Sequence, residues 1–134
     1  MIDIENDVFD YVAKALRAEF SDLLVLSSFA VAPAKFPCMT LVEADNRVIQ
    51  RMRTDNIENA VSVMYEANIY SNKGVGKKTE AKEIANAVDS LFNDIGFTRT
   101  FRQQVPNMKD ATIYRIVCRY EAGVDKNLTI YFNE

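Results

Sequence analysis

A loop rich in glycine and lysine comes nearest to a known ligand-binding pattern. It reads SNKGVGKKT at residues 71–79 and lies between an expected strand and an expected helix. Phosphate-binding loops share this context, because N–H groups at the start of a helix attract anions. The pattern fails at Ser71, where a glycine is needed, and at Lys78, where a Ser or Thr must follow the lysine. Three interpretations stay open: a flexible loop with an assembly role, which we favour, a site for another anion, or a nucleotide site.

Few other residues offer chemistry. The chain has no histidine, the commonest general base and the commonest metal ligand. Its two cysteines, Cys38 and Cys118, stand far apart in apolar, strand-like surroundings, which predicts buried free thiols. The acidic residues between Asp3 and Asp10 are typical of a solvated face at a helix start. We therefore expect no catalytic residue, no cofactor and no metal.

Arginines on expected strands are the remaining candidates. They are Arg47, Arg51, Arg53, Arg99, Arg102, Arg115 and Arg119. With 16 basic and 19 acidic residues the net charge is −3, which weighs against duplex nucleic acid as the main partner. Arginine is also favoured in protein interfaces, where its planar group pairs with carboxylates. We expect such pairing between subunits. The candidate interface residues are Asn72, Lys73, Gly74, Val75, Gly76, Lys77, Arg51, Arg53, Arg99 and Arg119.

Hydrophobic periodicity divides the chain into helices and strands within a single domain, residues 1–134. Helical spacing predicts helices over 4–20 and 78–95. Alternation predicts strands over 23–29 (continuing toward 32), 39–44, 47–53, 60–71, 98–105, 111–120 and 127–132. A hairpin turn is expected near Asp45-Asn46, and Asp3 is expected to cap the first helix.

The element order α-β-β-β-β-α-β-β-β predicts an α+β fold. We expect a two-layer sandwich, with two helices on one face of a mainly antiparallel sheet. The expected core joins the apolar stripe of the second helix to one face of strand 60–71 and of residues 112–120. The stripe consists of Ile84, Val88, Leu91, Phe92 and Ile95, and the strand face of Val61, Val63, Tyr65, Ala67 and Ile69.

Several sequence segments, taken together, resemble one family. They are VSVMYEANIYSN at 61–72, the Lys/Gly loop, EAKEIA at 80–85, GFTR at 96–99, VPN at 105–107 and IYRIVCRY at 113–120. In these segments, in size and in its helix-first order, the chain resembles the tail terminator and tail completion proteins of tailed bacteriophages. The resemblance covers most of the chain and is best over 60–120.

The resemblance implies a structural virion protein and no enzyme. Such subunits form a ring, typically a hexamer, that caps the tail tube and joins it to the head connector or head-completion protein. DNA would only pass through the ring as cargo, and no membrane is involved. The protein would reside in the tail or neck of the virion after assembly in the host cytoplasm. The alternatives are another ring of the neck region and a small anion- or nucleotide-binding regulatory domain.

Overall fold

The computed structural model describes residues 1–28, 33–50, 59–106 and 110–131. Its elements, in chain order, are α1 (Glu5–Glu19), β1 (Leu24–Leu26), β2 (Cys38–Val48), β3 (Ala60–Ser71), α2 (Lys77–Asp94), β4 (Thr98–Gln104), β5 (Tyr114–Asp125) and β6 (Ile130–Tyr131). Neither of these helices is long and apolar enough to cross a membrane.

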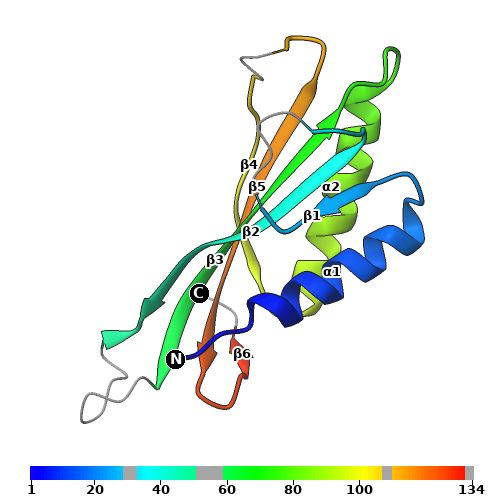
Figure 1. Cartoon of the computed structure of the whole chain (residues 1–134). Coiled ribbons are helices and arrows are strands. Elements are labelled where there is room, and N and C mark those ends of the chain that lie inside the picture. The colour runs from blue at the N-terminus through cyan, green and yellow to red at the C-terminus, as the bar shows by residue number, and fades with distance from the viewer. Residues whose placement is uncertain (29–32, 51–58, 107–109, 132–134) are drawn as a thin grey trace.

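All the described strands belong to one sheet. The strand order is β1-β2-β3-β5-β4, with β6 beside β5. The short β1 pairs with β2 in parallel, and every other pairing is antiparallel. Both helices pack on the same face of this sheet (Figure 1). The fold is therefore the expected α+β two-layer sandwich.

The core lies between the helices and the alternating face of β3 and β5. The five expected residues of β3, from Val61 to Ile69, are all buried there. Tyr65, Phe92, Phe97 and Tyr120 form an aromatic cluster within it. The rings of Phe92 and Tyr120 are stacked, with centroids 4.4 Å apart. Stacked and edge-to-face aromatic pairs stabilise a core beyond the area they bury.

The expected hairpin at Asp45-Asn46 is wrong. β2 continues through these residues as one strand and pairs with β3 as far as Val48. Its register shifts between Glu43 and Asp45, which marks a β-bulge. A bulge inserts one residue, so the side chains beyond it change faces. In the sequence, the alternation of apolar and polar residues is therefore broken at the bulge. Such a break looks the same as the end of one strand followed by the start of another.

Other expected bounds need smaller corrections. β1 spans only Leu24–Leu26, and part of the strand expected beyond it lies outside the described residues. β5 begins later than expected and continues to Asp125, because β3 offers a partner along its whole length. Ile4 is the N-cap of α1, while the Oδ1 atom of Asp3 accepts a hydrogen bond from the Glu5 N–H at 3.0 Å. In the stripe of α2, Leu91 and Ile95 are only half-buried.

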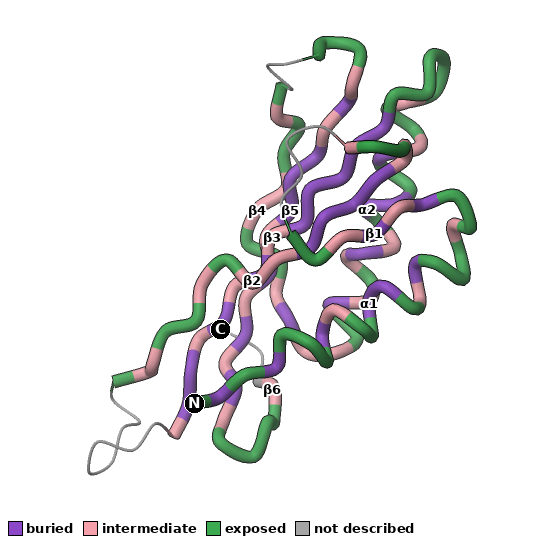
Figure 2. The backbone as a smooth tube through the Cα atoms, viewed as in Figure 1, coloured by how far each residue is buried: buried purple, intermediate pink, exposed green. Residues whose placement is uncertain are grey.

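One end of the sheet reaches beyond both helices. It is formed by the ends of β2 and β3 nearest Val48 and Ala60, together with β6 (Figure 1). The N-terminal residues before α1 run beside it, and Asn46 Nδ2 donates to the Ile2 carbonyl at 3.1 Å. Buried residues continue along β3 into this end of the sheet (Figure 2). The molecule is therefore elongated along its strands.

Candidate functional site

The Lys/Gly loop joins β3 to α2 at the end of the sheet opposite Val48 (Figure 1). Residues 72–76 are exposed, and α2 begins at Lys77 rather than at Lys78 as expected. Gly76 has a φ of 92°, in the left-handed region that a glycine adopts without strain. Val75 is 93% exposed between the two glycines of the loop. This apolar tip therefore has no packing role within the chain.

Side chains fix the loop at both of its ends. Ser71 Oγ donates to Glu80 Oε1 at 2.6 Å, and the Lys73 N–H donates to Ser71 Oγ at 3.4 Å. The ammonium of Lys77 donates to the Thr112 carbonyl at 3.0 Å. In a phosphate-binding loop the lysine must direct its ammonium at the phosphates. In this structure the ammonium of Lys77 instead binds a backbone carbonyl, and the exposed loop is held at both of its ends.

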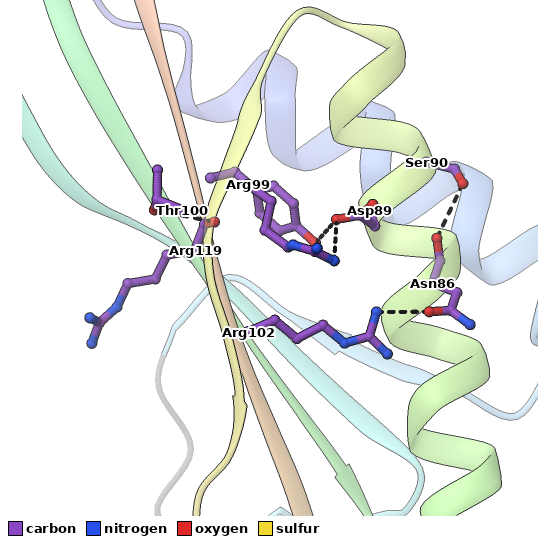
Figure 3. Close-up of polar contacts among 8 residues, drawn as sticks. Asn86, Asp89, Ser90, Arg99, Thr100, Arg102 and Arg119 are labelled. Atoms are coloured by element: carbon purple, nitrogen blue, oxygen red, sulfur yellow. Dashed lines mark hydrogen bonds and ion pairs between the residues drawn. The ribbon is translucent and has the colours of Figure 1, made fainter. Parts of the chain in front are cut away.

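The candidate arginines do not form one patch. Arg99 and Arg102 point from β4 toward α2, where Arg99 Nη1 lies 3.4 Å from Asp89 Oδ1 and Arg102 Nη1 donates to Asn86 Oδ1 at 2.7 Å (Figure 3). Arg119 points to the opposite side of the sheet in the same view. Arg51 and Arg53 lie outside the described residues.

The face of the sheet away from the helices carries a connected polar chain. Arg119 Nε lies 3.0 Å from Glu66 Oε1, and Asn68 Nδ2 donates to Glu66 Oε2 at 3.2 Å. Nε and Nη2 of Arg115 both donate to Asn68 Oδ1, at 2.9 and 2.6 Å. Asn68 is buried, so these bonds satisfy an amide that has lost contact with water. The sequence placed both arginines on a polar strand face, but their partners depend on the β3–β5 register.

Titratable groups in the core are held neutral. Tyr65 OH donates to Glu43 Oε2 at 2.7 Å, and burial, followed by this hydrogen bond, raises the pKa of the phenol. Burial likewise raises the pKa of Tyr120, whose hydroxyl lies 3.3 Å from Asp89 Oδ1. Burial raises the pKa of the Cys38 thiol to about 11. These groups stay protonated near neutral pH and serve packing rather than nucleophilic chemistry.

Sequence reasoning missed a groove between α1 and α2. Two adjoining hollows of about 470 and 530 Å³ share Glu19, Phe20 and Glu83 in their lining. The first hollow reaches the Lys/Gly loop at Lys73, and the second follows α2 to Leu91. One sequence signal was available: Glu83, Ala87 and Leu91 recur every four residues, which places an acid and two apolar side chains on one flank of α2.

The structure thus presents two regions rather than one active centre: the polar sheet face, and the helix groove with the adjoining Lys/Gly loop. Within the described ranges, no group of three or more His, Cys, Asp or Glu side chains could hold a metal ion. Comparisons with protein-family models and with curated proteins found no match to this chain.

Proposed function

We propose that this protein is a structural subunit of a tailed-phage virion that assembles as a ring, caps the tail tube and joins it to the head connector. The proposal begins from the sequence resemblance, which is best over residues 60–120 and covers β3, α2, β4 and β5. It assigns the chain a binding role in an assembly and no enzymatic one.

The observation that carries the proposal is the open edge of β4. This strand is the last in the sheet order. Six of its seven residues pair with β5, and its other side has no strand beside it among the described residues. Four of its side chains, Arg99, Thr100, Gln103 and Gln104, are exposed. Unpaired strand edges are templates for pairing with another chain, and repeated head-to-tail pairing closes a ring when the rotation is right.

The exposed loop suits a contact along the axis of such a ring. Val75 is presented at its tip, while Ser71 and Lys77 anchor its base. A loop positioned by a rigid scaffold can dock on a neighbour with little rearrangement. In the proposal this loop contacts the tail tube or an adjoining subunit.

Electron microscopy of the purified chain, alone and mixed with tail tubes, tests the proposal. Closed rings, most simply of six subunits, are expected in solution and at the ends of tubes. A chain that stays monomeric at high concentration and leaves tubes uncapped would overturn it. Rings that bind the head connector but not the tube would support the alternative of another neck protein. ATP hydrolysis that is lost in Lys77→Ala would support the nucleotide-binding alternative.

A further inference from the structure

The groove between α1 and α2 is lined by both acidic and apolar residues. The acidic ones are Glu19, Asp22, Glu80 and Glu83, and the apolar ones include Phe20 and Leu91. Lys73 is the single basic residue among those lining it. Glu19 and Glu83 are exposed, while Phe20 and Leu91 are half-buried. The groove therefore suits a segment that brings apolar side chains together with positive charge.

One segment of this chain has that chemistry. Residues 47–53 read RVIQRMR, with three arginines, three apolar residues and no acidic residue. Arg47 and Val48 end β2 at the sheet end that reaches beyond the helices, and residues 51–53 lie outside the described ranges. The described part of the segment is at the opposite end of the molecule from the groove (Figure 1). One subunit therefore cannot fill its own groove with this segment.

We infer that the α1–α2 groove binds the basic segment 47–53 of a second copy of this chain. Arginines of the segment pair with Glu19 and Glu83, both of which are exposed in the groove lining. Val48 stays packed on the core of its own chain, so opposite charge is the basis of the contact. The contact joins two different surfaces, so each subunit keeps one free groove and one free segment for further neighbours. Such a heterologous contact is the kind from which rings are built. The inference rests on the proposed function in requiring that copies of the chain associate.

Charge reversal on both sides of the contact tests the inference. Sedimentation velocity of the full chain would compare wild type with Glu19→Lys/Glu83→Lys, Arg51→Glu/Arg53→Glu and the four-fold combination. Each double reversal should weaken self-association roughly tenfold, because two attractive pairs become repulsive. The combination should recover most of the loss. Asp94→Lys makes the same charge change as one of the two groove substitutions, at an exposed position of α2 outside the groove lining, and should leave association unchanged.

A cysteine pair provides an independent readout that does not depend on affinity. Glu83→Cys and Arg51→Cys in one chain should form disulfides between copies under mild oxidation, giving a ladder of covalent oligomers. Both native cysteines are buried and unpaired, so they contribute little background. Asp94→Cys with Arg51→Cys is the matched control and should give no ladder.

The outcomes separate this inference from the proposed function. Two outcomes would overturn the inference and leave the ring proposal standing. In one, Glu19→Lys/Glu83→Lys and Asp94→Lys form rings of the same stability. In the other, the four-fold variant recovers none of the lost self-association. A chain that never associates would overturn both. Melting curves that match the wild type would show that the reversals act on association and not on folding.

Discussion

Phe92 on α2 provides the sharpest test of the core. Its side chain is fully buried, and its ring lies within 6 Å, centroid to centroid, of Tyr65, Phe97 and Tyr120. Phe92→Ala removes a ring that three other aromatic rings enclose, and the surrounding β-strands can collapse only partly into the space. Substitutions of this kind cost about 3–5 kcal/mol. The free energy of unfolding of a typical domain is about 5–15 kcal/mol, so a large share should be lost.

The adjoining residue supplies the control. Leu91 lies on the flank of α2, half-buried, where it lines the groove. Because part of its surface already contacts water, Leu91→Ala should cost only about 1–2 kcal/mol, which is below the range for a fully buried leucine. Sequence periodicity alone gave Leu91 and Phe92 the same role in the core, and the structure assigns them different ones.

Urea unfolding monitored by circular dichroism measures both changes. With an m-value of about 1.5 kcal/mol/M, a loss of 4 kcal/mol moves the midpoint by about 3 M, and a loss of 1.5 kcal/mol moves it by about 1 M. The m-values should stay equal, since neither variant changes the surface that unfolding exposes by much. Equal midpoint shifts for the two variants, or a smaller shift for Phe92→Ala, would refute the placement of α2 on the sheet.

The remaining predictions concern the surfaces and pH. Val75→Asp should leave the melting temperature unchanged and reduce tube capping, measured by counting capped tubes; unchanged capping would remove the loop from the contact. Arg99→Ala should cost under about 1 kcal/mol, since both partners of its ion pair are more than a third exposed. Arg119→Ala should lower the free energy of unfolding by about 1–2 kcal/mol, because it removes an ion-pair partner from Glu66, whose side chain is only 14% exposed. Equal losses for Arg99→Ala and Arg119→Ala in urea unfolding would contradict this prediction. The Cys38 thiol, whose pKa rises from 9.0 to about 11 on folding, contributes stability that is complete below pH 9 and falls as pH rises toward 11. By pH 10 this contribution to the free energy of unfolding has fallen by about 1.4 kcal/mol. Unfolding curves at pH 7 and pH 10 should show this loss in the wild type but not in Cys38→Ala, and the same pH dependence in both proteins would contradict the prediction.

The sequence allowed the central elements to be predicted because their periodicity is uninterrupted. β3 alternates between buried and half-buried residues from Val61 to Ala67, and α2 keeps an apolar stripe along its 18 residues. Each pattern reports a local property: which side chains share a face. The two-layer arrangement followed from the order of such elements.

The failures arose where structure depends on a partner strand. Nothing local distinguishes the bulge after Glu43 from a turn, because Asp45 and Asn46 are common in both, and only the pairing with β3 holds β2 together. The same holds for Arg115 and Arg119, whose bonds to Asn68 and Glu66 require the register of β3 against β5. The groove needs the packing of α1 against α2, which sequence spacing on either helix does not specify.

The distribution of apolar surface separates folding from assembly in this protein. The aromatic cluster around Phe92 is closed within one subunit, and the large exposed apolar residues of the described ranges, Met1, Tyr11, Val75 and Leu128, are scattered. Within the described residues, then, the exposed apolar side chains give no sign that a neighbour is required for folding. In the proposed ring, the contacts would come from the β4 edge, the loop and the acidic groove, which are mostly polar. Polar contacts depend on geometry and charge more than on buried area, so single changes there can abolish assembly in a monomer that still melts normally.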